Sequence, residues 1–498
     1  MIDSKTLSYE FPEEKLGFEE PPRQPVAPPA VGERAAVALI AAGLLGLMVT
    51  LLGLPLVGTW PGFFASFGLI SAGGALFFFF RHRGTTPGIK HNGLTFANVT
   101  SRGLVAWGFG LAMTGFYVVL YFWPERLERA TRLVDPLALA LVGKPADHWF
   151  LYGFLYTAAV LVFGVRMLMK YRLNRYHLVR TSSVMFFQLG FAFLIPHILK
   201  ALNQPEFYFS YFWPLKYEYL FPATVHDLVA HPGGLGTFLV FWGVVLTFVA
   251  TPVLTYFFGK RWYCSWVCGC GGLAETLGDP FRQLSSKSER AWSIERWMVH
   301  SVLVLIAVLT ALLWIEATAG QSLLGAWSAT LRQWYGFFIG TFFSGIIGVG
   351  FYPIFGSRVW CRFGCPMAAI LGLLQRCFSR FRITTNGGQC MSCGNCSTFC
   401  EMGIDVRAYA QRGENIVRAS CVGCGVCAAV CPRGVLSLEN GLTPKDRFAG
   451  AENPIQVLIQ SFKQPRIYEP RPADRPLTPS EPRATEPAVL HAPCATPR

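Results

Sequence analysis

Eight long apolar runs between residues 35 and 355 constrain the fold more than any other feature of this chain. Most have roughly the 17–25 residues that an α-helix needs to cross the hydrocarbon core of a bilayer. Backbone amides and carbonyls find no hydrogen-bond partner in lipid, so a spanning segment has to satisfy them internally, as a helix does. The sequence therefore predicts a polytopic α-helical membrane protein with about eight transmembrane helices, at 35–57, 60–80, 103–123, 149–165, 183–199, 235–258, 298–315 and 335–355.

The composition and the distribution of positive charge agree with a membrane protein and predict its orientation. Charged residues make up only 14% of the 498 residues, against about 25% in soluble proteins. If the N-terminus is cytoplasmic, the inner loops hold 20 of the Lys and Arg residues and the outer loops hold 7. Because cytoplasmic loops carry an excess of Lys and Arg, we expect both termini on the cytoplasmic side of a bacterial inner membrane. This asymmetry accounts for much of the net charge of +14, so the charge does not indicate a nucleic-acid partner.

Two cysteine runs with identical spacing follow the last apolar run, at 390–400 and 421–431. Each reads C-x2-C-x2-C-x3-C, the spacing of a bacterial two-cluster ferredoxin, in which the fourth cysteine of each run ligates the other cluster. Structural zinc usually uses two C-x2-C pairs, and the cytoplasm disfavours disulfides. The sequence therefore predicts two [4Fe–4S] clusters, one held by Cys390, Cys393, Cys396 and Cys431 and the other by Cys421, Cys424, Cys427 and Cys400.

Two further cysteine motifs lie at the inner ends of the sixth and eighth apolar runs. The first contains Cys264, Cys268 and Cys270, and the second contains Cys361 and Cys365. Side chains four residues apart share one face of a helix, so four thiolates meet at the membrane edge if the two spans are neighbours. Four is the number that one [4Fe–4S] cluster or one tetrahedral zinc needs, and the additional cysteine leaves open a fourth cluster. A site for another metal such as copper and cysteines that serve only packing are the alternatives.

Differences in composition divide the chain into four parts. Residues 1–34 are acidic and rich in Pro, which predicts a disordered cytoplasmic tail. Residues 35–382 form the transmembrane domain with both membrane-edge motifs, and residues 383–440 form a small cytoplasmic α+β ferredoxin module. Residues 441–498 are again rich in Pro and charge, too polar to bury a core, which predicts a second disordered tail.

The order of these motifs over roughly residues 183–440 resembles the membrane polyferredoxin family. Its members include the quinol-linked membrane subunit of periplasmic nitrate reduction, the membrane protein that supports nitrous oxide reductase and the accessory protein of haem–copper oxidases. The stretch from Cys400 to Arg407 is similar to C-P-T-G-I-D-I-R in the last of these. Two positions depart from the family pattern, because Gly269 and Glu401 stand where Pro usually follows a cysteine. The resemblance implies iron–sulfur electron transfer at a membrane and leaves the redox partner unassigned.

The sequence favours an electron-transfer protein whose partners are a redox protein, a quinone and membrane lipid. No phosphate-cradling Gly loop and no Ser/His/Asp set occurs, so no catalytic residue is expected. The aromatic-rich outer loop at 201–234 predicts an interfacial belt, with a pocket for a quinone head as the alternative. His197 and His300 lie near opposite membrane faces, too far apart to share one haem iron. An assembly or metal-reducing factor for a respiratory enzyme and a redox sensor are the rival hypotheses.

Overall fold

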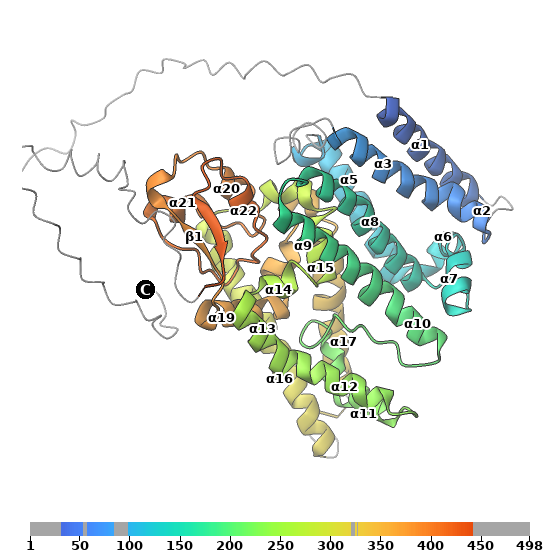
Figure 1. The fold of residues 1–498 in the computed structure, drawn as a ribbon. Helices are drawn as coiled ribbons and strands as arrows, with labels where there is room; N and C mark the ends of the chain where they lie inside the picture. Colours follow the sequence, from blue (N-terminus) through green and yellow to red (C-terminus); the bar gives the residue numbers. More distant parts are fainter. Residues whose placement is uncertain (1–30, 53–56, 84–97, 320–323, 326, 442–498) are drawn as a thin grey trace, which may run out of the picture.

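The computed structural model describes residues 31–52, 57–83, 98–319, 324–325 and 327–441 (Figure 1). The tails expected at 1–34 and 441–498 lie outside these ranges, apart from 31–34, which are helical, and residue 441. Within the described ranges the protein is mostly helical and has one two-stranded sheet. This is the fold class that the sequence predicts.

Seven helices are long and apolar enough to cross a membrane, judged by length and composition among the described residues. They overlap the first seven apolar runs, and three of them contain a π-helical segment. The label η marks both π-helices, such as η1, η4, η6, η8 and η9, and short 3-10 helices, such as η3, η5, η7 and η10. They are α1 (Val31–Leu51), α2–η1–α3 (Trp60–Phe63, Phe64–Gly68, Leu69–Arg83), α5 (Leu104–Phe122), α8 (His148–Lys170), α9–η4–α10 (Arg175–Phe186, Phe187–Leu194, Ile195–Ala201), α12–η6–α13 (Leu235–Val245, Leu246–Ala250, Thr251–Phe258) and α16 (Glu289–Thr318).

The eighth expected span, at 335–355, is not among these seven helices. The chain here forms α17 (Trp327–Tyr335) and the π-helix η8 (Gly336–Ile347), and a turn separates η8 from the next helix. Arg332 and Gln333 lie in the first half, and their polar side chains lower its mean hydropathy. The helical segment therefore runs from 327 to 347 and is less apolar than the sequence pattern indicates.

Two of the spanning helices continue beyond their apolar runs, and these extensions contain buried cationic residues. α8 continues through Arg166 and Lys170, and α9 begins before its apolar run and contains Arg180. These three side chains are buried and form ion pairs with acidic residues of the segment 264–284. Because their charges are paired, they can lie inside the helical bundle rather than in a solvated loop.

Short elements at the ends of the spans carry the cysteine motifs. α15 lies near the centre of the bundle, where it contacts α8, α9 and η4, and α19 contacts α13 and α16. The short elements before the ferredoxin module are η3 (Pro124–Leu127), α6 (Glu128–Arg132), α7 (Asp135–Val142), η5 (Tyr217–Leu220), α11 (Pro222–Ala230), α14 (Arg261–Cys264), α15 (Gly269–Glu275), η7 (Asp279–Leu284), α18 (Tyr352–Phe355), η9 (Trp360–Gly364) and α19 (Pro366–Phe378).

The ferredoxin module lies against one end of the helices (Figure 1). Its strands β1 (Arg382–Thr385) and β2 (Leu436–Glu439) pair antiparallel, and the two cysteine runs lie between them in the chain. Tyr176 Oη and Ser265 Oγ each donate a hydrogen bond to a backbone carbonyl of the second cysteine run, at 2.8 Å. The helices thus hold the backbone that carries the cysteines. The short helices of the module are η10 (Gly387–Gln389), α20 (Asn395–Thr398), α21 (Val406–Arg412) and α22 (Val426–Ala429).

Candidate iron–sulfur centre and adjoining cavities

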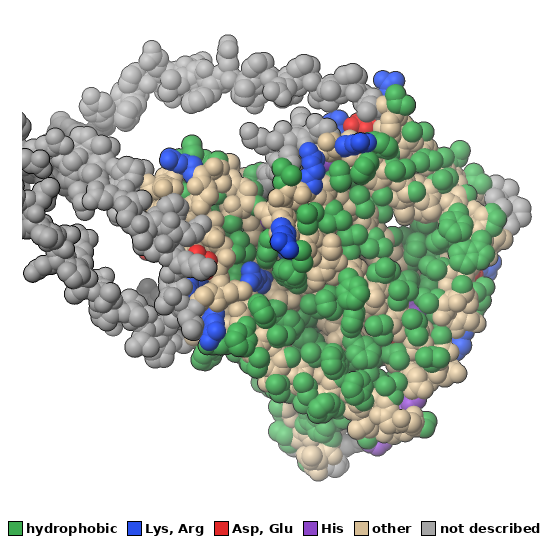
Figure 2. Space-filling model, viewed as in Figure 1, with side chains coloured by type: hydrophobic (Ala, Val, Ile, Leu, Met, Phe, Trp, Pro, Cys, Tyr) green, Lys and Arg blue, Asp and Glu red, His purple; other side chains and the backbone are tan. Residues whose placement is uncertain are grey.

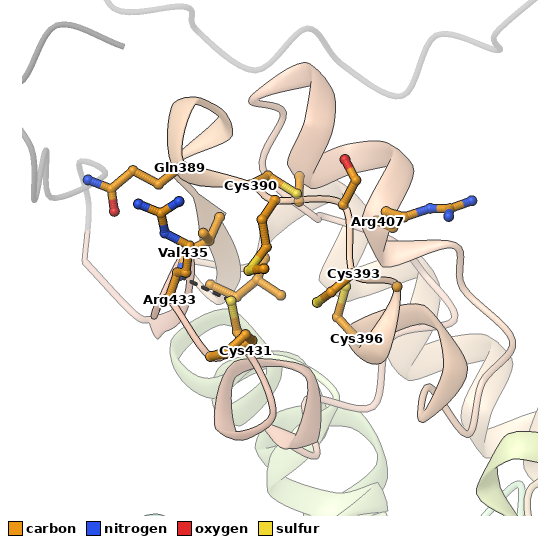
Figure 3. A pocket seen from close by; sticks show the side chains of 14 residues that line it. Gln389, Cys390, Cys393, Cys396, Arg407, Cys431, Arg433 and Val435 are labelled. Atoms are coloured by element: carbon orange, nitrogen blue, oxygen red, sulfur yellow. Dashed lines mark hydrogen bonds between the residues drawn. The ribbon is translucent and has the colours of Figure 1, made fainter. Parts of the chain in front are cut away.

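Four cysteines line the first of two small pockets in the ferredoxin module. They are Cys390, Cys393, Cys396 and Cys431, and their side chains point toward one another in Figure 3. Arg407 also lines this pocket, but its guanidinium group points away from the sulfurs. The four cysteine sulfurs are therefore the candidate metal ligands of this pocket.

The second pocket is also lined by four cysteines, and it is the more enclosed of the two because Cys421 and Cys427 are buried, whereas Cys393 is exposed. Each pocket takes three cysteines from one run and the fourth from the other run. The cysteines of the second pocket are Cys400, Cys421, Cys424 and Cys427.

The two cysteine runs fold by the same local geometry. Gly394 and Gly425 have φ angles of +77° and +80°, a region that glycine reaches without steric cost, and they precede α20 and α22. The Sγ atoms of Cys400 and Cys431 each accept a hydrogen bond from the backbone amide four residues later, at 3.4 and 3.3 Å. Hydrogen bonds to sulfur stabilise thiolate ligands and help to set the reduction potential of a cluster.

The chemistry of these donor sets fits [4Fe–4S] clusters. All eight cysteines of the two runs are free rather than disulfide-bonded, and each pocket offers the four sulfur ligands that a cubane needs. Without metal, burial raises the pKa of the Cys421 thiol to about 11. Iron that binds there therefore has to displace protons, which links cluster insertion to pH.

Four cysteines of the two membrane-edge motifs form one buried group, called here the membrane-edge quartet. Cys264 ends α14, Cys268 precedes α15, Cys361 lies in η9 and Cys365 precedes α19. Each is at most 7% exposed, and all four belong to the hydrophobic core that also contains the ferredoxin cysteines. The thiol of Cys365 interacts electrostatically with the other three thiols. The four thiols therefore lie near one another within this core.

Cys270 differs from the quartet because it is only half-buried and faces two cavities. Its thiol forms a hydrogen bond with that of Cys268. The preceding residue is Gly269, where a Cβ atom would lie 2.2 Å from the hydroxyl of Tyr211 and 2.6 Å from Oε1 of Gln188. Glycine, at this departure from the family pattern, leaves room for both side chains beside the backbone.

Two adjoining cavities, of about 350 and 650 Å³, lie between the quartet and the outer loop. The smaller cavity reaches Cys361, and the larger reaches Asp147 and Lys200 near the outer ends of the helices. The tyrosine-rich wall thus joins the quartet to the end of the bundle that lies away from the ferredoxin module. The residues that line both cavities are Trp149, Tyr152, Tyr156, Tyr211, Lys216 and Cys270.

The larger cavity contains a buried hydrogen-bond acceptor. Gln188 lies in η4 and is 4% exposed, and its Nε2 donates to Thr157 Oγ1 at 3.0 Å. Its Oε1 has no hydrogen-bond partner among the described residues, and buried acceptors without a partner are rare in proteins. A bound molecule with a hydroxyl group, or a water molecule, can satisfy this oxygen. Tyr208 and Tyr211 of the aromatic segment 201–234 line the same cavity.

A network of buried ion pairs, called here the Arg–Glu network, separates the quartet from the second ferredoxin pocket. Its three carboxylates belong to Glu275, Asp279 and Glu401, and each is bound by at least two cations. The pairs are Arg166–Asp279 (2.7 Å), Lys170–Asp279 (2.6 Å), Arg180–Glu275 (2.7 Å), Arg282–Glu275 (2.6 Å), Arg282–Asp279 (2.7 Å), Arg282–Glu401 (2.8 Å), Arg358–Glu275 (2.8 Å) and Arg358–Glu401 (3.1 Å).

The two glutamates of the network differ in their pKa. Burial alone would raise the pKa of Glu275, but the charges of the surrounding arginines lower it to about 2. Burial raises the pKa of Glu401 above its ordinary value despite the same kind of neighbours. Oxygens of both glutamates and the sulfur of Cys424 lie within 4.8 Å of one another, a spacing suited to a metal ion. The arginines already bind both carboxylates, so a further cation would be repelled.

Little in the sequence indicates this network. Glu401 departs from the family pattern, and Glu275 and Asp279 belong to no cysteine motif. The available signal was that these two are the acidic residues of the cysteine-rich segment 264–284. A carboxylate beside metal-ligating cysteines needs a cationic partner when it is buried.

Comparison with known proteins shows two iron–sulfur domains. A 4Fe-4S binding domain matches residues 241–288 and 335–385, which contain the quartet, and a 4Fe-4S dicluster domain matches residues 382–432. No solved structure matches the chain.

Two curated relatives match the chain in part. YccM of Escherichia coli (strain K12), named as a candidate electron transport protein, is 27% identical over 238 residues, which are 42% of this chain and 64% of YccM. The regulatory protein NosR of Stutzerimonas stutzeri is 26% identical over 174 residues, which are 33% of this chain and 22% of NosR. The match thus spans less than two thirds of either relative. The chain is a multi-pass membrane protein with two 4Fe-4S-binding domains and is related to membrane-associated polyferredoxin-like proteins.

Proposed function

We propose that the chain is a membrane-bound iron–sulfur protein that transfers electrons through three [4Fe–4S] clusters. The observation that carries this proposal is that cysteines of all three groups contribute to a single hydrophobic core. Electron transfer requires redox centres that are close together and held in fixed positions. A continuous core provides both conditions, and the 4Fe-4S binding domain that covers 241–288 and 335–385 supports a cluster at the quartet.

Each cluster would be held by four cysteines and would supply one-electron redox chemistry when bound. The chain itself buries the centres, donates hydrogen bonds to sulfur and holds the ferredoxin module against the helices. We assign the first cluster to Cys390, Cys393, Cys396 and Cys431, the second to Cys400, Cys421, Cys424 and Cys427, and the third to Cys264, Cys268, Cys361 and Cys365.

The two cavities support a quinone as the redox partner on the membrane side. They are lined by aromatic side chains, they reach Cys361, and they contain the unsatisfied acceptor of Gln188. A quinol hydroxyl can donate to this oxygen while the ring lies against tyrosines. Oxidation of a quinol to a quinone would release two electrons, which a cluster at the quartet would accept one at a time, and two protons, which the cavity carboxylates Glu206 and Glu218 can accept. Reduction of a quinone follows the same steps in reverse.

The distribution of charge supports a cytoplasmic ferredoxin module. In Figure 2, many of the basic side chains lie near the ferredoxin module and at the helix ends beside it, and fewer lie along the far edge. Cytoplasmic sides of membrane proteins carry this excess. A cytoplasmic module also keeps the cysteines in a reducing compartment, where thiolates remain available for iron.

The metal content of the purified protein tests the proposal. We expect about twelve iron and twelve acid-labile sulfide per chain after anaerobic purification in detergent, four of each for every [4Fe–4S] cluster. Cys365→Ser should lower the content to about eight, because it removes a ligand of the quartet. Cys270→Ser is the matched control and should retain about twelve, since this cysteine lies outside the quartet.

Two results would contradict the proposal. A wild-type content near eight would mean that the quartet holds no cluster, and copper at one per chain would favour the metal-reducing assembly factor. Loss of iron in Cys270→Ser with full iron in Cys365→Ser would reverse the assignment of ligands at the membrane edge.

A further inference from the structure

The Arg–Glu network contacts both of the cysteine groups that it separates. Nη1 of Arg358 donates to Sγ of Cys361 at 3.7 Å and to the backbone carbonyl of Cys264 at 3.1 Å. Nη1 of Arg282 donates to Sγ of Cys424 at 3.9 Å. One arginine therefore contacts the quartet, and another contacts the second ferredoxin group.

Two carboxylates, those of Glu275 and Glu401, each bind both of these arginines. Glu275 binds Arg358 at 2.8 Å and Arg282 at 2.6 Å, and Glu401 binds them at 3.1 and 2.8 Å. All four side chains are at most 4% exposed, so water does not screen their charges. Buried charges in contact interact far more strongly than charges in water. A change of charge beside one arginine is therefore felt at the other.

Positive charges outnumber negative charges in the network. Its four arginines stay protonated at every physiological pH, they face three carboxylates, and Lys170 adds a further cation. An unbalanced buried charge is costly unless an anion lies nearby. Four thiolates around a [4Fe–4S] core give a negative site, and reduction makes it more negative. The two flanking cysteine groups would thus supply the missing negative charge.

We propose that the Arg–Glu network sets the reduction potentials of the two clusters that flank it and couples them electrostatically. This inference rests on the proposed function. One electron that passes between the flanking sites moves one negative charge from the side of Arg358 to the side of Arg282, or back, and no covalent bond forms or breaks. Arg282 and Arg358 are positioning residues, since they act through the sulfurs of Cys424 and Cys361.

The first ferredoxin group provides an internal reference. None of the ion pairs of the network involves a side chain that lines its pocket, and Cys393 there is exposed to solvent. Solvent screens distant charges. The cluster at this pocket should therefore respond little to changes in the network.

Potentiometric titration of the full-length protein in detergent, followed by EPR, tests the proposal. Glu275→Gln removes a negative charge and should raise the potentials of both flanking clusters, whereas Arg358→Gln removes a positive charge and should lower both. We expect about a tenfold change in the ratio of reduced to oxidised cluster at a fixed potential, equal to about 59 mV for a one-electron couple. Glu414→Gln removes an exposed carboxylate of the ferredoxin module and should shift no potential.

Opposite signs in the two variants distinguish an effect of charge from a distortion of the fold. Shifts of the same sign, a shift of one flanking cluster alone, or an equal shift of all three clusters would overturn the proposal. Arg358→Lys keeps the charge and should restore most of the potential lost in Arg358→Gln, so this pair decides the question if Glu275→Gln fails to fold. A wild-type content of about eight iron per chain would contradict the proposed function. A content of about twelve iron per chain, with reduction potentials that do not change when the charge of the network changes, would contradict only this inference.

Discussion

Gly269 is the residue at which the outer loop, the cavities and the quartet meet. Its missing side chain lets Tyr211 and Gln188 approach the backbone beside Cys268. Cys270 lies at the cavity wall, whereas Cys268 lies in the core. One glycine thus allows a buried metal ligand and a cavity-facing thiol to lie two positions apart.

Gly269→Ala should weaken the interaction with quinone without removing the clusters. The new Cβ would lie 2.2 Å from the Tyr211 hydroxyl and 2.6 Å from Gln188 Oε1, so both side chains must move into the cavity. Overpacking of this kind costs about 1–3 kcal/mol, and we expect the rate of cluster reduction by a soluble quinol to fall about tenfold. Anaerobic stopped-flow absorbance measures this rate.

Gly190→Ala is the control for that measurement. It lies in the same π-helix as Gln188, and its Cβ would meet nothing within 4 Å. Reduction by dithionite should be unchanged in both variants, because dithionite does not need the cavity. A wild-type rate with quinol in Gly269→Ala would show that quinone reacts elsewhere.

The helices α8 and α9 illustrate which parts of the structure the sequence could predict. Their apolar segments followed from hydropathy. The two ferredoxin groups of four cysteines and the five membrane-edge cysteines were predicted from spacing, because both are local patterns. The ends of these helices beside the ferredoxin module did not follow, since Arg166 reads as a loop residue until its partner Asp279, 113 positions away, is known. The same holds for Arg358, which is 83 positions from Glu275. Pairing across such separations leaves no periodic signal.

Asp279→Asn should destabilise the contact between α8 and η7. Burial alone would raise the pKa of Asp279, but Lys170, Arg166 and Arg282 lower it well below its ordinary value. A depressed pKa means that the carboxylate stabilises the fold fully above about pH 4 and loses this effect only as the pH falls further. Removal of one partner of a buried ion pair costs about 3–5 kcal/mol, so we expect a clear fall in the melting temperature in detergent at pH 7.

Glu128→Gln is the matched control for the loss of an ion-paired carboxylate. Glu128 pairs with Arg132 on the surface, where both side chains are exposed, and such pairs contribute little to stability. Its melting temperature should remain close to that of the wild type. Equal melting temperatures for Asp279→Asn and Glu128→Gln would mean that the buried pairs do not hold these elements together.

The whole molecule joins a lipid-facing helical slab to a compact metal-binding module. Large apolar side chains cover the outer surface of the helices, as Figure 2 shows, and the ferredoxin module lies at one end of the slab. Cysteines of the module and of the membrane-edge quartet contribute to one core where the two parts meet. The side of the membrane on which the module lies depends on how many helices cross the membrane. That number is even if α17 and η8 together cross it and odd if they do not.

Reporter fusions to the full-length chain should show the module in the cytoplasm. Seven spans would place the module opposite the N-terminus, whereas a crossing by residues 327–347 restores the same side. The excess of Lys and Arg in the inner loops favours the even number. We expect a C-terminal green fluorescent protein to fluoresce, and alkaline phosphatase inserted at Gly325, between α16 and α17, to be active outside. A dark C-terminal reporter with an inactive inserted phosphatase would reverse the orientation, and reporters on the same side would mean that α17 and η8 stay within one face of the membrane.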